Sequence, residues 1–492
     1  MIRSIEQPGA EKKRSVPSAP YSRAILASLV GLTAAAAARA EPADLLVRSA
    51  TIVDVRDGTL HQDRTIVIRG REIVDVTSDE AGRRYSADRT VDARGRYVIP
   101  GLWDMHVHFG GGEALMAENK ALLPLYVAQG VTTVRDAAAD LASHVLEWRA
   151  AVADGTLLGP TIFTSGPKLE GYRPSWKGTL EVGTPAEVDA ALDQLQAMRV
   201  DFVKITDNTL APETYLYAVR EATRRGLRTS AHVPMALTIE QVTSAGLTSI
   251  EHLDYLVKAG SPEEGRIAAD FTAGRLTYAE ASQALSESFD RERAMRAYRE
   301  LAARGTFVTP TLNGSRIIAY LDREDHSRDP FLAHIGPGLK ATYAWRVERA
   351  AKDDVAAIER RHRRYERLET VLPMLEAAGI TILAGTDAGY LNSYNYPGLG
   401  LHEELELFVH CGLTPLQALQ SATLAGPKFF GLEQRYGSIE PGRTPDLVLL
   451  AGNPLDDIRA LRSIDGVVLH GRYLDRAALD ALLGPATPAA AD

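Results

Sequence analysis

The sequence contains very little cysteine, with Cys411 alone among 492 residues. A single cysteine excludes an intramolecular disulfide and a cysteine metal cluster. A bound metal ion would therefore need histidine, carboxylate or modified lysine ligands. The sequence also lacks an apolar run of the ~20 residues that cross a membrane, so we expect no membrane span in the mature protein.

Positive charge is not in excess either. Lysine and arginine number 55 against 64 acidic residues, which gives a formal net charge of −9. No region resembles a nucleic-acid-binding surface, and we expect no nucleic-acid partner. The apolar content of 45% and the charged content of 24% are ordinary for a soluble globular protein. The composition leaves the oligomeric state open, including a homo-oligomer.

The first forty residues have the features of a secretory signal peptide. Basic residues within 12–23 precede an apolar stretch at 24–38, which suits the core of a signal and is too short for a membrane span. Ala38 and Ala40 fit the small-x-small pattern of a cleavage site. We therefore expect residues 1–40 to be a cleaved signal peptide and the protein to be exported, periplasmic or secreted. The alternatives are an uncleaved anchor and a start codon assigned too far upstream.

Both ends of the remaining chain have the pattern of β-strands. Residues 44–92 are rich in β-branched residues, and Gly70 separates two short strand-like runs, which indicates a hairpin. Strand-like runs return at 446–450 and 467–473, but this second group is too small to bury a core alone. The two groups together predict one small β-sandwich domain. Its expected bounds are residues 41–97 and 433–480, followed by a flexible tail at 481–492.

Between these ends, strand-like and helical patterns alternate. Amphipathic helical runs are commonly closed by glycine and followed by an apolar run. Eight such units predict an α/β fold, a (β/α)8 TIM barrel over residues 98–432. An open doubly wound sheet is the alternative, although no Gly-x-Gly-x-x-Gly motif follows a strand. The expected strands are 98–106, 131–136, 161–165, 202–206, 228–232, 248–252, 306–310 and 380–387.

Two long stretches exceed what a minimal barrel needs. Residues of about 253–304 and 316–378 have helical patterns. We interpret both as helical insertions on the loop side of the barrel, where a lid is one possible role.

Chemistry-bearing side chains end five of the expected strands. Catalytic residues of a (β/α)8 barrel lie at the C-terminal ends of its strands, where they converge on the barrel axis. His106 and His108 are two residues apart, so on an extended backbone their imidazoles point to the same face. Agreement among five strand ends favours a metal site over separate capping or hydrogen-bonding roles. The predicted site residues are His106, His108, Lys204, His232, His252 and Asp387.

With these motifs, the chain resembles members of the amidohydrolase superfamily, in the branch of imidazolonepropionase-like and prolidase-like enzymes. The resemblance covers nearly all of residues 44–475. The matching stretches are 100–108, 130–136, 201–205, 249–253, 385–389, 401–407, 412–415 and 437–450.

The resemblance implies a binuclear metal centre, with two Zn²⁺ ions as the expected pair. Lys204 would be carboxylated on its amine and would bridge both ions, which offsets their mutual repulsion. A metal-activated hydroxide would attack the substrate, with Asp387 as general base and then general acid. The implied ligands are His106, His108 and Asp387 for one ion and His232 and His252 for the second.

The same resemblance favours hydrolysis of an amide bond in a dipeptide or N-acyl amino acid. The free carboxylate would need a cation or hydroxyls, for which Tyr172, Arg173 and Tyr390 are candidates. In the prolidase-like branch an aromatic residue often follows the strand-five histidine, whereas here residues 233–235 are Val-Pro-Met after His232. This departure leaves aromatic amides and toxin-like amides open as substrates.

Three other functions stay open. A cyclic-amide hydrolase or deaminase of the imidazolonepropionase type would use one metal ion, and Lys204 argues against it because such members lack the bridging lysine. A lactonase or phosphotriester hydrolase would use the same metals with a different pocket. The third is a non-catalytic ligand-binding protein. The presence of all six predicted metal ligands argues against it.

Overall fold

The structure is a computed structural model that describes residues 40–138, 140–174 and 176–484. The predicted signal peptide, apart from Ala40, lies outside these residues, as does the predicted tail from residue 485. Among the described residues, no helix is both long and apolar enough to cross a lipid bilayer.

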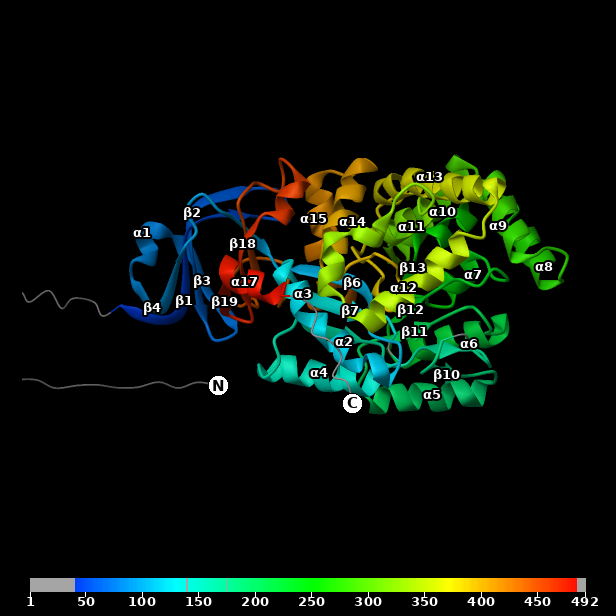
Figure 1. Cartoon of the computed structure of the whole chain (residues 1–492), viewed down its shortest axis with the longest axis horizontal. Helices are drawn as coiled ribbons and strands as arrows, with labels where there is room; N and C mark the ends of the chain where they lie inside the picture. The colour runs from blue at the N-terminus through cyan, green and yellow to red at the C-terminus, as the bar shows by residue number, and fades with distance from the viewer. Residues whose placement is uncertain (1–39, 139, 175, 485–492) are drawn as a thin grey trace, which may run out of the picture. The chain divides into compact units, whose positions relative to one another are not determined.

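Strands from both ends of the described chain share one eight-stranded sheet (Figure 1). Its order is β19-β18-β17-β5-β1-β2-β3, and β4 pairs with β1. The N-terminal and C-terminal groups meet where β5 pairs antiparallel with β17. Stacking into a two-layer sandwich stays a prediction. The strands are β1 (Glu41–Val53), β2 (Leu60–Arg69), β3 (Glu72–Ser78), β4 (Tyr85–Asp92), β5 (Tyr97–Pro100), β17 (Leu447–Leu450), β18 (Ile464–Leu469) and β19 (Arg472–Asp475), with short helices α1 (Asp79–Gly82) and α17 (Arg476–Leu482).

The expectation of one strand over 467–473 is wrong. The chain turns at His470 and Gly471, so that β18 and β19 form an antiparallel hairpin. Both turn residues have positive φ, +50° at His470 and +85° at Gly471. Two-residue hairpin turns of this kind match the twist of the flanking strands. The sequence analysis missed this turn because only one of the two turn residues is glycine.

The predicted barrel strands are present as parallel strands in two sheets. One sheet has the order β10-β9-β11-β12-β13-β14-β15 and the other β16-β6-β7-β8. The chain around the expected strand 380–387 contributes to both sheets. β15 lies in the first sheet, and β16, the next strand along the chain, lies in the second. At the other seam, the Asp201 N–H donates to the Thr164 carbonyl at 2.9 Å. One closed eight-stranded barrel stays a prediction.

The parallel strands are short, and most of their residues are buried. They are β6 (Leu102–His108), β7 (Val131–Asp136), β8 (Thr161–Thr164), β9 (Leu169–Glu170), β10 (Leu180–Glu181), β11 (Val203–Ile205), β12 (Thr229–Ala231), β13 (Ser249–Glu251), β14 (Phe307–Thr309), β15 (Thr381–Ile382) and β16 (Ala388–Gly389).

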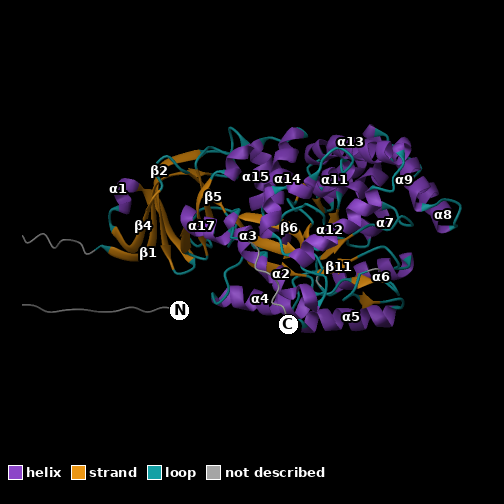
Figure 2. Cartoon of the chain, viewed as in Figure 1, coloured by secondary structure: helices purple, strands orange, loops and turns teal. Residues whose placement is uncertain are grey.

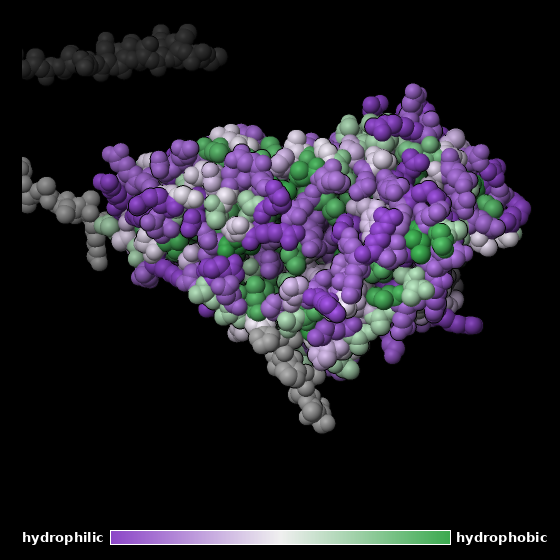
Figure 3. Space-filling view, turned by 45° about the horizontal axis from the view of Figure 1, so that its top comes forward, coloured by the Kyte–Doolittle hydropathy of each residue, from purple (hydrophilic) through white to green (hydrophobic). Residues whose placement is uncertain are grey.

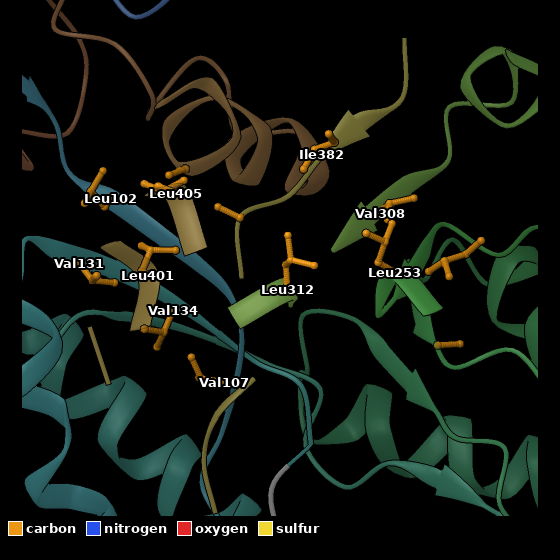
Figure 4. Close-up of a cluster of buried hydrophobic side chains, with 14 of the residues drawn as sticks. Leu102, Val107, Val131, Val134, Leu253, Val308, Leu312, Ile382, Leu401 and Leu405 are labelled. Carbon is orange, nitrogen blue, oxygen red and sulfur yellow. The ribbon is translucent and has the colours of Figure 1, made fainter. Parts of the chain in front are cut away.

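Helices surround these strands (Figure 2). Apolar side chains from β6, β7 and β14 and from the helices after β14 and β16 form one buried cluster, which fixes the strands relative to the helices (Figure 4). The helices outside the predicted insertions are α2 (Met116–Ala121), α3 (Leu123–Ala128), α4 (Ala142–Asp154), α5 (Pro185–Ala197), α6 (Pro212–Arg224), α7 (Ile239–Ser244), α14 (Leu399–His410), α15 (Pro415–Thr423) and α16 (Ala425–Phe430).

Both predicted insertions are helical. Threonine capping boxes begin α5, α7, α9 and α15, which explains several of the helix starts. The insertion helices are η2 (Leu253–Gly260), α8 (Glu264–Thr272), α9 (Tyr278–Glu287), α10 (Arg291–Ala303), α11 (Leu312–Ala319), α12 (Pro337–Ala350) and α13 (Val355–Ala377).

The face seen in Figure 3 is mostly hydrophilic, with apolar residues in scattered spots. Such isolated apolar residues are normal on a soluble surface. Among the described residues, the exposed large apolar side chains are Tyr172, Tyr278, Trp345 and Val355.

A single residue, Gly101, joins the shared sheet to the strand that carries the histidine pair. β5 ends at Pro100 and β6 begins at Leu102, while the Gly101 N–H donates to the Asp446 carbonyl at 2.8 Å. A Cβ atom at Gly101 would lie 2.1 Å from the Thr132 hydroxyl oxygen. Only glycine permits this close approach, so the junction between sheet and strand is fixed by backbone packing.

Candidate metal centre

Of the six predicted ligands, three lie within parallel strands (His106, His108 and Lys204) and two directly follow such strands (His232 and His252), whereas Asp387 directly precedes β16. We call His106 and His108, at the end of β6, the inner pair. Their Nε2 atoms lie 3.2 Å apart. The Asp387 Oδ1 atom lies 2.9 Å from His108 Nε2 and 3.5 Å from His106 Nε2. The potential ligand atoms of these three residues all lie within 4.8 Å of one another, close enough to surround one metal ion.

His232 and His252, which follow β12 and β13, form a second pair that we call the outer pair. Their Nε2 atoms lie 3.1 Å apart. The His252 ring is also near the inner pair, since its centroid lies 5.0 Å from that of His106. Two ligands on one tetrahedral zinc ion are about 3.3 Å apart for Zn–N bonds near 2.05 Å. Both pairs have the spacing of ligands that share an ion.

The second nitrogen of each imidazole is held by the protein. The Nδ1 of His106 lies 2.7 Å from Glu251, and that of His108 lies 3.1 Å from the Ala138 carbonyl. Because carboxylates and carbonyls only accept, these Nδ1 atoms carry the proton and leave Nε2 with a bare lone pair. In the outer pair, the Nδ1 of His232 lies 3.2 Å from the Asp207 carboxylate, which only accepts, and the Nδ1 of His252 lies 2.7 Å from the Thr311 hydroxyl, which can accept or donate.

This arrangement fits a metal cation. In the inner pair, two Nε2 lone pairs face each other and the Asp387 carboxylate, which is repulsive unless a cation lies among them. Burial lowers the pKa of His106 and His232 well below the usual range, and lowers that of His252 to about 3. The rings are therefore neutral, as metal ligands must be. Histidine ligands typically donate their other N–H to a protein acceptor in this way.

Lys204, in β11, has the properties that a bridging ligand requires. Its side chain is buried, and its amine makes no hydrogen bond with any described residue. Burial, with help from Arg135 and Lys168, lowers the pKa of Lys204 to about 8, although Glu251 and Asp387 oppose the shift. A low pKa favours the neutral amine that carbamate formation needs.

Glu251 and Arg135 support the inner pair, a role that the sequence analysis missed. The Glu251 carboxylate is fully buried and accepts from His106 and from Arg135, both at 2.7 Å. Its second oxygen accepts from the Ser230 and Ser249 hydroxyls. The position of Glu251 directly before His252 was an available signal, but its partner Arg135 is 116 residues away along the chain.

The backbone is strained where three strands end. His252, Asp387 and Thr311 have φ values of +68°, +66° and +49°, which non-glycine residues rarely adopt. Such outliers persist where the surrounding structure enforces them, and they cluster at functional sites. Here they turn the side chains of two predicted ligands and of one of their supporting residues toward the centre.

The three predicted substrate contacts differ in position. Tyr172 is 52% exposed and donates its hydroxyl proton to Glu187 at the start of α5. Arg173 is also exposed. Tyr390 packs edge-on against Trp176 at 5.5 Å, and the Trp176 ring lies 5.6 Å from that of His108. Of the three, only Tyr390 is connected to the metal centre by these contacts.

The family of the chain follows from comparison with known proteins. A family model described as the amidohydrolase family matches residues 97–474. The chain belongs to the amidohydrolase family. This confirms the resemblance seen in the sequence, and the matched residues include all six predicted ligands.

Curated relatives of this amidohydrolase carry different activities in their names. The ochratoxinase of Aspergillus niger is 24% identical over 466 residues, covering 82% of this chain and 81% of that protein. The adenine deaminase of Ruegeria pomeroyi is 31% identical over 163 residues, covering 33% of this chain and 26% of the deaminase. The family is therefore shown, whereas the substrate is not.

Solved structures share the fold of this amidohydrolase. A Bifidobacterium longum protein described as a candidate prolidase has a TM-score of 0.64 at 24% identity, covering 89% of this chain and 98% of its own. The A. niger ochratoxinase has a TM-score of 0.62 at 19% identity, covering 91% of this chain and 98% of the ochratoxinase chain. At these identities the likeness concerns the fold alone.

Proposed function

We propose that this amidohydrolase is an exported, binuclear hydrolase that cleaves an amide bond in a small substrate such as a dipeptide or N-acyl amino acid. The observation that carries the proposal is the set of four histidines, each with Nδ1 held by the protein and Nε2 turned toward a neighbouring ligand. Similarity to proteins named prolidase and Xaa-Pro dipeptidase supports the choice of an amide bond. The proposed framework is a closed (β/α)8 barrel with a β-sandwich domain.

The proposal assigns ligands to two divalent ions, with Zn²⁺ as the expected metal. The inner pair with Asp387 would bind one ion and the outer pair the other, with carboxylated Lys204 between them. Bound ions would supply Lewis acidity to polarise a carbonyl and would lower the pKa of water. Without carboxylation, Lys204 would place an ammonium among cations, so the modification belongs to the proposal.

Asp387 is the residue proposed to move the proton. Its side chain is 18% exposed, unlike that of His106, so it faces both the ligands and the space where substrate would bind. The Asp387 carboxylate would accept a proton from the attacking water and return it to the leaving nitrogen. Glu251 would keep His106 oriented throughout, because its carboxylate accepts the Nδ1 proton in a hydrogen bond and leaves Nε2 free to bind an ion.

The experiment combines metal content with hydrolysis. Mass spectrometry on protein purified without chelators should find two zinc-like ions per chain, and a screen of dipeptides and N-acyl amino acids should reveal hydrolysis. In the same assay, Asp387→Asn should lower kcat by at least ~10³ because ligation and proton transfer are both lost.

Other results would redirect or overturn the proposal. One tightly bound ion would favour a mononuclear cyclic-amide hydrolase or deaminase, the class to which the partial similarity to adenine deaminases points. No bound metal after reconstitution with zinc and bicarbonate would contradict a metal-dependent hydrolase. Cleavage of lactones or phosphotriesters in place of amides would retain the metal centre and reject the substrate class.

A further inference from the structure

One buried cation near the metal centre has no partner among the described residues. Lys168 precedes β9 and is 7% exposed. Its ammonium lies over the Trp176 ring, 4.5 Å from the ring centroid. Neither a hydrogen bond nor an ion pair joins it to another described residue, in contrast to Lys258, whose buried ammonium donates to two backbone carbonyls at 2.6 Å. Burying an unpaired charge is costly, so such a lysine calls for an explanation.

The carboxylates around Lys168 already contact other groups. Glu170 accepts from Thr206 at 2.5 Å and from the Thr209 N–H at 3.0 Å. Asp207 contacts His232 and the Tyr255 hydroxyl. A third carboxylate, Asp387, belongs to the inner pair's ligand set.

These carboxylates nevertheless act on Lys168 at a distance. Burial lowers the pKa of Lys168 to about 8, while Glu170, Asp207 and Asp387 oppose the shift. Near pH 7 the amine is therefore still mostly an ammonium.

Lys168 is separated from the inner pair by one indole ring. Trp176 contacts Lys168 on its face, and its ring lies 5.6 Å from that of His108 and 5.5 Å from that of Tyr390. In a peptide, the scissile carbonyl carbon and the carboxylate carbon of the next residue are separated by three bonds, about 3.8 Å when extended. The carboxylate of such a substrate thus lies within one residue of the scissile carbonyl, as an anion subsite next to the metal centre requires.

Another cation within electrostatic range of Asp387 is half-buried and already hydrogen-bonded. Arg346, from α12, donates to the Leu391 carbonyl at 3.0 Å and to the Asn392 side chain. These contacts hold the segment after β16 and occupy two of the guanidinium nitrogens. Arg173, the cation expected to bind substrate, is exposed. Lys168 is thus the buried cation whose position and missing partner point to a ligand.

We propose that Lys168 and Trp176 form an anion subsite that binds the free carboxylate of the substrate beside the scissile amide. This inference rests on the proposed function and narrows its substrate class to amides with a carboxylate next to the cleaved bond. The ammonium supplies the counter-charge, and the indole, together with Tyr390, packs against the apolar part adjacent to the carboxylate. A neutral C-terminal amide loses the charge pair and binds less tightly.

Binding and hydrolysis of an acid and its neutral analogue test the subsite. The probes are N-acetyl-phenylalanine and N-acetyl-phenylalaninamide, titrated calorimetrically into metal-loaded wild type, Lys168→Met and Lys168→Arg. Wild type should prefer the acid by ~10- to 100-fold, as expected for a charge-assisted contact. Lys168→Met should lose that preference with binding of the amide unchanged, and Lys168→Arg should retain most of it.

The matched control is Lys177→Met, which removes the exposed lysine next to Trp176 in the chain. It should keep the wild-type preference, and kcat/KM for each probe should follow binding in every variant. Metal content and circular dichroism identify any variant that fails to fold, in which case Lys168→Gln replaces Lys168→Met. A purely structural role for Lys168 would weaken acid and amide equally.

The outcomes separate the subsite from the proposed function. Equal binding of acid and amide by wild type, or an acid preference that survives in Lys168→Met, overturns the subsite even if amides are hydrolysed. A Lys168-dependent preference for the acid without hydrolysis of any amide supports the subsite and contradicts the proposed function.

Discussion

The two histidine pairs of the candidate centre are built differently. The inner pair is buried, with His106 at 0% and His108 at 8% side-chain exposure, whereas His232 in the outer pair is 22% exposed. The inner pair depends on Glu251, which also neutralises a buried arginine and accepts from two serines. The outer pair depends on Asp207 and on a threonine hydroxyl.

The inner pair is therefore the more strongly supported by the protein interior, and the outer pair is the more accessible to solvent. The charged network behind the inner pair ties it to the protein interior, so disturbing that network also disturbs folding. The outer pair lies beside Tyr255, whose ring stacks on His232 at 5.7 Å and whose hydroxyl reaches Asp207. Tyr255, from η2, thus places an aromatic ring directly beside the outer pair.

The largest effect is expected from the residue that joins the two pairs. Lys204→Ala should lower activity by at least ~10³ and reduce the bound metal at both pairs, because the proposed carbamate would contribute a ligand to each ion. Short carboxylates such as formate or acetate should restore part of the activity by taking the place of the carbamate. Activity assays and metal analysis check this, with Lys177→Ala as the exposed control. Two tightly held ions in Lys204→Ala would contradict a bridging role.

A smaller and unequal effect is expected from the residues behind each pair. Glu251→Gln and Asp207→Asn should each weaken metal binding by ~10- to 100-fold, the usual effect of removing a partner of a histidine ligand. Glu251→Gln should in addition destabilise the fold by about 3–5 kcal/mol, since it leaves the Arg135 charge buried without a counter-charge. Denaturant unfolding and metal titration of both variants provide the measurement. Equal losses of stability would erase the distinction between the pairs.

The smallest effect is expected outside both pairs. Tyr172 is exposed and its hydroxyl contacts Glu187 rather than the metal centre. Tyr172→Phe should change the free energy of unfolding by no more than about 0.5 kcal/mol and kcat/KM by no more than ~2-fold. A tenfold rise in KM with unchanged kcat would restore Tyr172 as a substrate contact.

The sequence predicted those site residues whose position at a strand end was enough to identify them. The inner and outer pairs, Lys204 and Asp387 could be chosen because strand ends in this fold converge by geometry alone. The strand order alone brings these residues together, so they could be predicted without knowledge of side-chain contacts.

The supporting residues could not be chosen in that way. Arg135 and Glu251 look like ordinary charged residues until β7 and β13 are placed across from each other. Lys168 lies after an expected strand that ends at residue 165, and only the loop that carries Trp176 makes it part of the site. The hairpin at His470 was missed although residues 470–472 are His-Gly-Arg, because only one of its two positive-φ residues is glycine.

The Gly101 junction has a consequence for the order in which the protein is made. The strand with His106 and His108 is anchored through β5, and β5 is paired with β17 at residues 447–450. Synthesis proceeds from the N-terminus, so β1, which also pairs with β5, is made first, but nearly the whole chain must be made before β17 exists. The first residues of the candidate centre to be synthesised are thus among the last to receive their full support, and nascent chains that stop before residue 447 lack the β17 side of it.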